Sequence, residues 1–301
     1  MRDAGAIEAG YDEDFVRELL LDQYPDLAGL PLRRVAGGWD NQLWRLGEEL
    51  AIRLPRTERA PELLRKEHRW LPTLAPHLPL PVTVPQRLAE PTEGFPRPWA
   101  VTNWVPGEPA DHAEITSAAA AETLAGFLRA LHHCPAPTDA PASGGRYAPL
   151  TEHTQDFHRD FQAATGEPIS ADIRKLWQDA VDAGPDNGPA VWLHGDLHPA
   201  NAVTSGGELA GVIDFGELCA GDPSVDLAAA WLLLPDGSAG RFFAAYGAAG
   251  QDVVRRARGR ALLAVIGLLM VGRAGEAGEP GGKVSWGRAG RKALERILAE
   301  G

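Results

Sequence analysis

Basic residues and long apolar runs are scarce in this 301-residue chain. Its 29 Lys and Arg face 41 Asp and Glu, which gives a formal net charge of −12. A chain of that charge lacks the basic surface of a general nucleic-acid binder. The longest apolar stretch, 261–271, is well short of the roughly 20 residues that cross a bilayer. We therefore expect no nucleic-acid partner and no membrane segment.

Cysteine is also rare, with only Cys134 and Cys219 in the chain. The opening residues, MRDAGAIEAG, carry acids where a secretory leader carries a basic end and an apolar run. Both features predict a reduced, cytoplasmic protein. What the chain does have is 44% hydrophobic and 23% charged residues, the composition of a folded protein, and a length that fits about two domains.

The first third predicts a small antiparallel sheet with helices. Apolar residues recur at helical spacing over 12–24, with Asp12 as a cap, and again over 58–74. Short runs between and after them, such as NQLWRL, ELAIRLP and WAVTNWV, have the texture of strands joined by turns. We expect two or three antiparallel strands before the second helix, and two further strands, VTVPQRL and WAVTNWV, after it.

The rest of the chain is predicted to be mainly helical. Helical patterns cover 115–132, 171–181 and 255–271, and a last helix is expected over 292–300. The glycine-rich stretch 272–290 predicts a loop. Only 191–231 interrupts the helices, with short apolar runs around polar loops, so we expect the chemistry there.

Three polar residues in that block have a suggestive spacing. Asp196 is followed by Asn201 in the run HGDLHPAN, and Asp214 comes later in VIDFGE. Phosphoryl transfer needs a carboxylate that accepts the proton of the attacking hydroxyl, and oxygen ligands for Mg²⁺. A loop and a hairpin could bring these groups to one cleft. Read singly, each residue is also an ordinary turn former.

With GDPSVDLA, these motifs resemble the aminoglycoside phosphotransferase-like (choline-kinase-like) enzymes of the protein-kinase fold. The resemblance implies an α+β fold of two lobes, with Asp196 as catalytic base and Asn201 and Asp214 as Mg²⁺ ligands. It gives Asp226 a structural role in bracing the catalytic loop. Asp222, which precedes Pro223, also suits a helix cap.

The same resemblance assigns nucleotide contacts in the first third. Gly38, Asp40 and Asn41 would line the phosphates, although a glycine pair alone also fits a plain hairpin turn. Arg53 stands where many relatives have lysine and is expected to contact the α- and β-phosphates. Glu67 would anchor it, or would instead be an exposed helix carboxylate.

The resemblance also places a linker at WAVTNWVPGE. Asn103 would offer a carbonyl and Val105 an amide to the purine of ATP or GTP, without choosing between them. The expected organisation is an N-lobe over 1–103, a hinge over 104–107 and a C-lobe over 108–301 with the catalytic loop, the metal motif and the acceptor site.

Histidines leave alternatives open. His198 either donates a hydrogen bond to the transferring phosphoryl group or caps its loop, and His194 is expected to be structural. Together with Asp196 these two histidines could instead bind the metal of a hydrolase. His132 and His133 are expected to end a helix rather than bind zinc. Arg53 in place of lysine also admits a pseudokinase-like binding module.

The expected activity is Mg²⁺-dependent transfer of the γ-phosphoryl group of ATP or GTP to a hydroxyl of a small molecule. Asp156 and Asp160, four residues apart, would share a helix face and suit a cationic acceptor, and Glu217 is a further expected contact. An aminoglycoside is the first expectation; a macrolide or a small metabolic alcohol is the alternative. The same acidity also serves solubility.

Overall fold

The computed structural model describes residues 10–35, 38–247 and 249–300 of the chain. The chain forms two compact units, and each is described by itself. Unit 1 comprises 1–76, 82–105 and 214–217; unit 2 comprises 77–81, 106–213 and 218–301. The short segment 214–217 therefore packs with the N-terminal unit, although most of its sequence neighbours do not. Among the described residues no helix is long and apolar enough to span a membrane.

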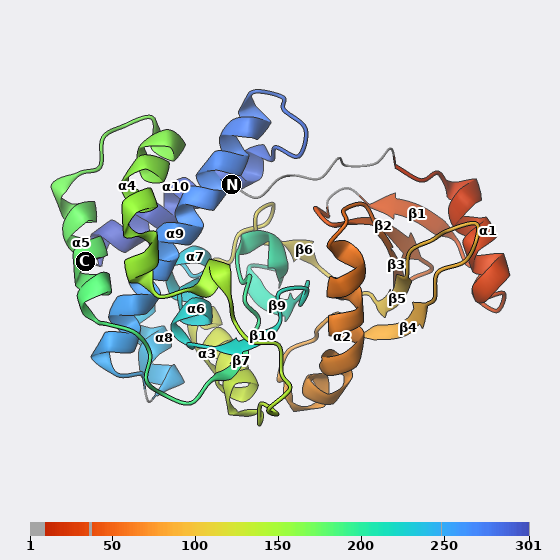
Figure 1. Ribbon diagram of the computed structural model, residues 1–301, viewed down its shortest axis with the longest axis horizontal. Coiled ribbons are helices and arrows are strands. Elements are labelled where there is room, and N and C mark those ends of the chain that lie inside the picture. Colours follow the sequence, from red (N-terminus) through yellow and green to blue (C-terminus); the bar gives the residue numbers. More distant parts are fainter. Residues whose placement is uncertain (1–9, 36–37, 248, 301) are drawn as a thin grey trace. The chain divides into compact units, whose positions relative to one another are not determined.

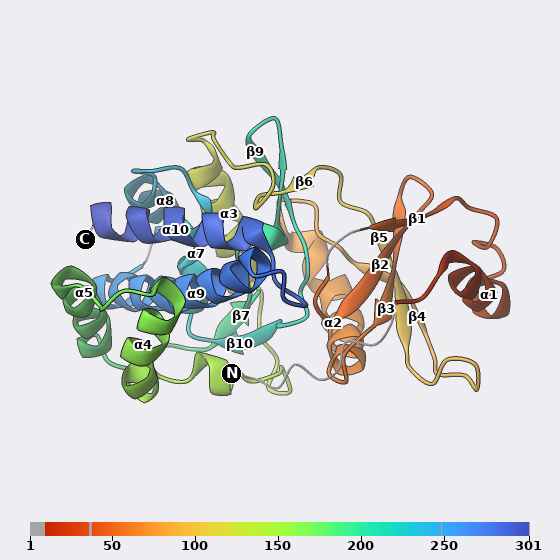
Figure 2. The ribbon, with the colours of Figure 1, turned by 90° about the horizontal axis from the view of Figure 1, so that it is seen from above.

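Unit 1 is an antiparallel sheet between two helices, as Figures 1 and 2 show. The strand order is β1-β2-β3-β5-β4. The bounds are α1 (Glu13–Gln23), β1 (Leu32–Val35), β2 (Asn41–Leu46), β3 (Leu50–Pro55), α2 (Ala60–Leu74), β4 (Pro85–Ala89) and β5 (Trp99–Asn103). Helix and strands fall where the sequence predicts them.

Successive side chains of β3 point to opposite faces of this sheet. Ile52 and Leu54 are fully buried in a core with Leu20 of α1. Arg53 lies on the opposite face, where it contacts Glu67 of α2. The predicted cap of α1 is present, since Asp12 Oδ1 accepts a hydrogen bond from the backbone N–H of Phe15 at 3.0 Å.

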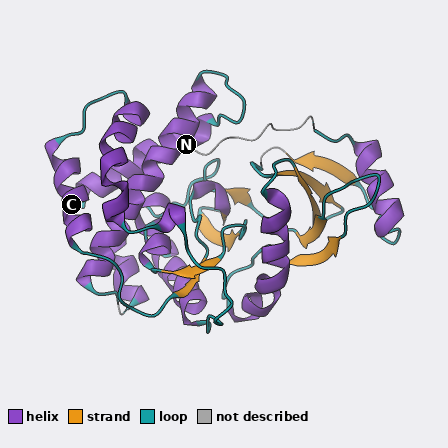
Figure 3. Cartoon of the chain, in the orientation of Figure 1, coloured by secondary structure: helices purple, strands orange, loops and turns teal. Residues whose placement is uncertain are grey.

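Unit 2 is mainly helical, with two small sheets of order β10-β7 and β6-β8-β9 (Figure 3). Its helices are α3 (Ala120–His133), α4 (Leu150–Thr165), α5 (Ala171–Asp182), α6 (Ser224–Leu227), α7 (Ala229–Leu233), α8 (Ala239–Tyr246), α9 (Gln251–Glu276) and α10 (Val284–Ala299). Its strands are β6 (Glu108–Pro109), β7 (Val191–Leu193), β8 (Ala202–Ser205), β9 (Glu208–Val212) and β10 (Cys219–Gly221). The two lobes of the predicted α+β fold are thus confirmed.

The predicted loop over 272–290 is largely wrong. Helix α9 continues to Glu276 and α10 already begins at Val284. The glycines serve helix packing: a Cβ on Gly272 would lie 2.2 Å from the Cα of Gly287. The glycine-rich sequence predicts a break in the helix, but the missing side chain of Gly272 instead lets α9 and α10 approach closely. The predicted helix over 115–132 also begins later, at Ala120.

Candidate active site

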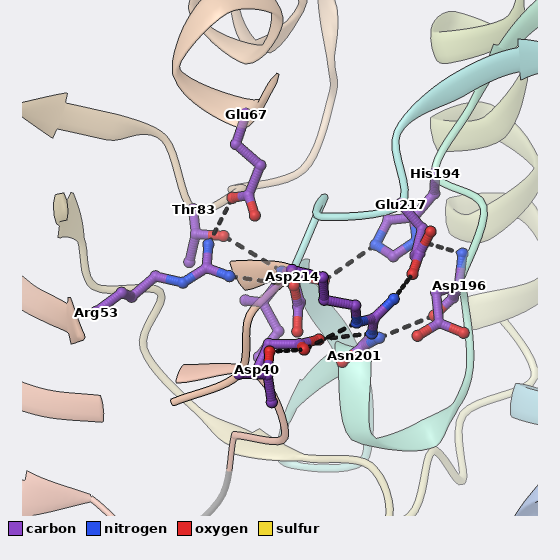
Figure 4. A network of polar contacts seen from close by, with 12 residues as sticks. Asp40, Arg53, Glu67, Thr83, His194, Asp196, Asn201, Asp214 and Glu217 are labelled. Atoms are coloured by element: carbon purple, nitrogen blue, oxygen red, sulfur yellow. Dashed lines mark hydrogen bonds and ion pairs between the residues drawn. The ribbon is translucent and has the colours of Figure 1, made fainter. Parts of the chain in front are cut away.

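In unit 1, a buried arginine joins two carboxylates (Figure 4). Arg53 Nη1 lies 2.5 Å from Oε2 of Glu67, and its Nη2 lies 3.2 Å from Oδ1 of Asp214. The side chain of Glu67 is wholly buried, whereas that of Asp214 is half exposed. Strand β3, helix α2 and the segment 214–217 are thereby linked through one guanidinium.

Burial and charge act in opposite directions on this cluster. Burial raises the pKa of Glu67 to about 7, because desolvation of its carboxylate outweighs the lowering effect of Arg53. Burial alone would lower the pKa of Arg53, but Glu67 and Asp214 raise it above the ordinary arginine value. Arg53 therefore keeps its positive charge at neutral pH.

Asp214 has an unusual backbone. Its φ is 61°, a left-handed conformation that aspartate tolerates better than most residues. Its N–H donates to the hydroxyl of Thr83 at 3.4 Å. A Cβ on Gly216 would lie 3.3 Å from Asp214 Oδ1 and 3.5 Å from Glu67 Oε1, so glycine keeps space around both carboxylates. The local fold presents Asp214 to solvent rather than to the core.

The turn before β2 needs its glycine. Gly38 has a φ of 73°, and a Cβ there would lie 2.1 Å from the carbonyl oxygen of Asn41. Its partner in the predicted pair, Gly37, lies outside the described residues. Asn41 is buried, and its Oδ1 has no hydrogen-bond partner in the described part of the chain.

Arg59 connects this turn to the segment 214–217. Its Nε and Nη2 donate to Oδ1 and Oδ2 of Asp40 at 2.8 and 2.6 Å, and its Nη1 donates to Oε1 of Glu217 at 2.5 Å. Thr57 also donates to Asp40 at 2.6 Å. Glu217, predicted to contact the acceptor, is thus paired within unit 1. Arg59 was not predicted as a site residue, and its only signal in the sequence is its position just before α2.

In unit 2, one buried aspartate holds the start of the loop that carries Asp196. Asp226 is 1% exposed, and its Oδ2 and Oδ1 accept hydrogen bonds from the backbone N–H groups of His194 and Gly195 at 2.7 and 2.9 Å. His132 Nε2 lies 3.3 Å from Asp226 Oδ2, and its Nδ1 lies 2.8 Å from the hydroxyl of Tyr246. Both His132 and His133 lie in the last turn of α3, as predicted, but the contact of His132 with Asp226 was not predicted.

His194 uses both ring nitrogens within the protein. Its Nδ1 accepts from the N–H of Asp196 at 3.1 Å, and its Nε2 lies 3.0 Å from the carbonyl of Ile213. This pattern requires the neutral tautomer with the proton on Nε2. Neither nitrogen is free to bind a metal, which argues against the hydrolase alternative. Among the described residues, no group of three or more His, Cys, Asp or Glu could hold a metal ion.

The other end of the loop is held by Asn201. Its Nδ2 donates to the carbonyl of Asp196 at 2.8 Å. His198 caps the following 3-10 turn, by accepting from Ala200 N–H at 3.3 Å, and also lies near the carboxylate of Asp196, with Nε2 3.6 Å from Asp196 Oδ2. Its ring packs edge-on against Trp286 of α10. The capping contact and the proximity to Asp196 coexist.

Each unit has one predicted Mg²⁺ ligand, Asn201 in unit 2 and Asp214 in unit 1. The described residues donate no hydrogen bond to Oδ1 of Asn201 or to Oδ2 of Asp214, which leaves an amide oxygen and a carboxylate oxygen available. Such hard oxygen atoms are the ligands that Mg²⁺ prefers. Each residue, taken by itself, therefore offers an oxygen atom that suits Mg²⁺.

The remaining predicted site residues have structural contacts. Asn103 uses its side chain to accept from Val84 N–H at 2.6 Å and to donate to the carbonyl of Val82 at 2.9 Å. Val105 is buried. Asp222 Oδ1 accepts a hydrogen bond from Ser224 N–H at 2.9 Å, but α6 begins at Ser224 and its N-cap residue is Pro223, one position later than the predicted cap.

The predicted acidic pair lies on α4. Asp156 and Asp160 do share one face; Asp156 is exposed and Asp160 is partly exposed. Arg159 lies between them, 2.7 Å from Asp156 and 2.9 Å from Asp160. One positive charge therefore offsets part of the negative charge that the sequence suggested.

Comparison with known proteins gives the family. The model of the phosphotransferase enzyme family (APH) matches residues 31–262, whereas none of the curated proteins matches the sequence. Among solved structures, the chain is similar to aminoglycoside 2'-phosphotransferase-IIIa in its GDP complex, with a TM-score of 0.69 and 18% identity over 96% of this chain and 99% of that one.

A second similar structure is macrolide 2'-phosphotransferase MphH from Brachybacterium faecium. It has a TM-score of 0.59 and 22% identity over 92% of this chain and 97% of that one. At identities this low, the similarity of the two structures to this chain shows a shared fold alone. The family match covers most of the chain, including the motifs around Asp196 and Asp214. The chain therefore belongs to the phosphotransferase enzyme family.

Proposed function

We propose that the protein transfers the γ-phosphoryl group of ATP or GTP to a hydroxyl of a small molecule, with Mg²⁺. The observation that carries the proposal is the catalytic loop, in which Asp226, His194 and Asn201 hold the backbone around Asp196 and leave its carboxylate partly exposed. Such a carboxylate can orient the attacking hydroxyl and accept its proton.

Asn201 and Asp214 would hold Mg²⁺, which neutralises charge on the phosphates when bound. Arg53, fixed by Glu67, would contact phosphate oxygens with its remaining donors. Gly38, Asp40 and Asn41 would lie along the phosphates, and Asn103 and Val105 would offer backbone groups to the purine. His198 would donate a hydrogen bond to the transferred group.

The acceptor is proposed to be an aminoglycoside-type antibiotic. The net charge of −12 and the exposed carboxylates on α4 favour a cationic, hydroxyl-rich compound. A solved neighbour was determined with GDP and kanamycin. A macrolide is the second candidate, because the fold is also similar to two macrolide 2'-phosphotransferases. The pseudokinase alternative is disfavoured, because Asp196, Asn201 and Asp214 are all present.

The test is a panel assay. The protein is incubated with MgATP or MgGTP and with aminoglycosides, macrolides or small alcohols, and nucleoside diphosphate release and the mass of the acceptor are followed. We expect diphosphate release that depends on the acceptor and an acceptor that gains one phosphate. An acceptor-independent release, or binding without turnover across the panel, would contradict the proposal.

A further inference from the structure

Side chains hold all four backbone polar groups of Gly195 and Asp196. The contacts join Gly195 N to Asp226 Oδ1 (2.9 Å), Gly195 O to the hydroxyl of Tyr147, Asp196 N to His194 Nδ1 (3.1 Å) and Asp196 O to Asn201 Nδ2 (2.8 Å). The peptide unit that carries the proposed base is thereby fixed on both sides.

Tyr147 differs from the other three residues because it lies outside the catalytic segment. It belongs to the 3-10 turn Gly145–Tyr147, between α3 and α4. Its hydroxyl donates to the carbonyl of Gly195, the group on the peptide bond that leads into Asp196. A rotation of that peptide would turn Asp196, so the tyrosine restrains the direction of the base.

The turn that carries Tyr147 is itself anchored. Arg260 of α9 is buried, and its Nη2 donates to the carbonyls of Tyr147 and Ala148 at 3.1 and 2.9 Å. A buried guanidinium that bonds two successive carbonyls leaves the turn little freedom. Tyr147 is therefore presented to the catalytic loop by the C-terminal helical part of unit 2.

The preceding loop does not depend on the Tyr147 hydroxyl for its path. Ser143 N–H donates to the carbonyl of Ala220 at 2.9 Å, and Ala220 N–H donates to the carbonyl of Pro141 at 2.7 Å. These bonds attach the loop to β10. Replacing Tyr147 by phenylalanine should therefore remove the hydrogen bond to the carbonyl of Gly195 and leave the loop in place.

We propose that Tyr147 is a positioning residue for Asp196, and that Arg260 positions Tyr147. The proposal rests on the phosphotransferase function proposed above. Tyr147 acts on the backbone of the catalytic loop and needs no contact with either substrate. Loss of the Tyr147 hydroxyl should lower the rate of phosphoryl transfer without weakening the binding of nucleotide or acceptor.

The test compares Tyr147→Phe in two backgrounds. In the otherwise unchanged protein we expect kcat to fall about 3- to 10-fold, as for the loss of one hydrogen bond, with both KM values within about twofold. In an Asp196→Asn background the same substitution should cost nothing further, because the base that it positions is gone. An equal loss in both backgrounds, or a change in KM alone, would overturn the proposal.

A second readout does not depend on activity. Hydrogen exchange of the backbone over 194–201 should be faster in Tyr147→Phe than in the parent protein, and unchanged exchange would overturn the proposal even if no acceptor is found. Tyr11→Phe is the matched control, since its hydroxyl also contacts a backbone carbonyl, that of Pro55 at 3.5 Å in unit 1. It should change neither kcat nor exchange over 194–201.

Discussion

Arg53 and Glu67 form a buried ion pair, with Nη1 of the arginine 2.5 Å from Oε2 of the glutamate. The pair joins the middle of the N-terminal sheet to α2. Because Nη2 of the same guanidinium reaches Asp214, the arginine ties the proposed metal ligand to the helix. A lysine ammonium has no rigid fork with which to hold both carboxylates in this way.

Arg53 is therefore expected to serve both nucleotide binding and turnover. Arg53→Ala should raise KM for the nucleotide and lower kcat together, each by about tenfold or more, because a buried carboxylate also loses its partner. Arg53→Lys should restore only part of the activity. Steady-state kinetics in both variants check this, and unaltered nucleotide kinetics in Arg53→Ala would show that another cation binds the phosphates.

Glu67 predicts a pH dependence of stability. Its folded pKa of about 7 lies above the ordinary value of 4.5, so the native state holds this proton more tightly than the unfolded state between those pH values. The stabilisation is complete below pH 4.5 and is lost as the pH rises through 7. Between pH 5 and pH 8 the free energy of unfolding, measured with denaturant, should fall more in the parent protein than in Glu67→Gln. The difference between the two proteins should reach up to about 3 kcal/mol. Equal losses would refute the assigned pKa.

Arg59 should matter for nucleotide binding. Its removal leaves Asp40 and Glu217 without their cation, and two free carboxylates would repel the phosphates that Asp40 is proposed to approach. We expect Arg59→Ala to raise KM for the nucleotide about tenfold. Arg65→Ala is the matched control, because Arg65 forms an exposed pair with Glu90 in the same unit. Similar kinetics in the two variants would contradict this role.

Much of the fold and part of the site were predictable from the sequence. Helical and strand periodicity located α1, α2 and the strands of the N-terminal sheet, because each buries one regular face. The run HGDLHPAN pointed to Asp196 and Asn201 because their short spacing places them in one loop. The glycines of α9 and α10 led to the wrong prediction of a loop. The sequence does not say whether a glycine ends a helix or lets a second helix pack closely against it.

The partners of the site were not predictable. Arg59, His132 and Tyr147 act through residues far along the chain, and only the folded structure brings them to Asp40, Asp226 and Gly195. For the same reason the sequence alone overstates the net negative charge of the face of α4 that carries Asp156 and Asp160. The arginine between them was visible in the sequence, but its pairing with both was not.

That pairing gives a test of the acceptor site. If the α4 carboxylates attract a cationic acceptor, Asp156→Asn with Asp160→Asn should raise its KM several-fold, whereas Arg159→Ala should lower it by freeing both carboxylates. Both effects should shrink at high ionic strength. An acceptor KM that responds to neither the substitutions nor the salt would place acceptor recognition elsewhere.

The most direct measurement is single-turnover phosphoryl transfer by Asp196→Asn with the acceptor found in the panel. The substitution keeps the size of the side chain but removes its proton-accepting charge. The rate of transfer should fall about 10²- to 10⁴-fold, while MgATP or MgGTP binds with nearly unchanged affinity by calorimetry. Transfer within a few-fold of the parent rate would contradict the assignment of Asp196 as the base.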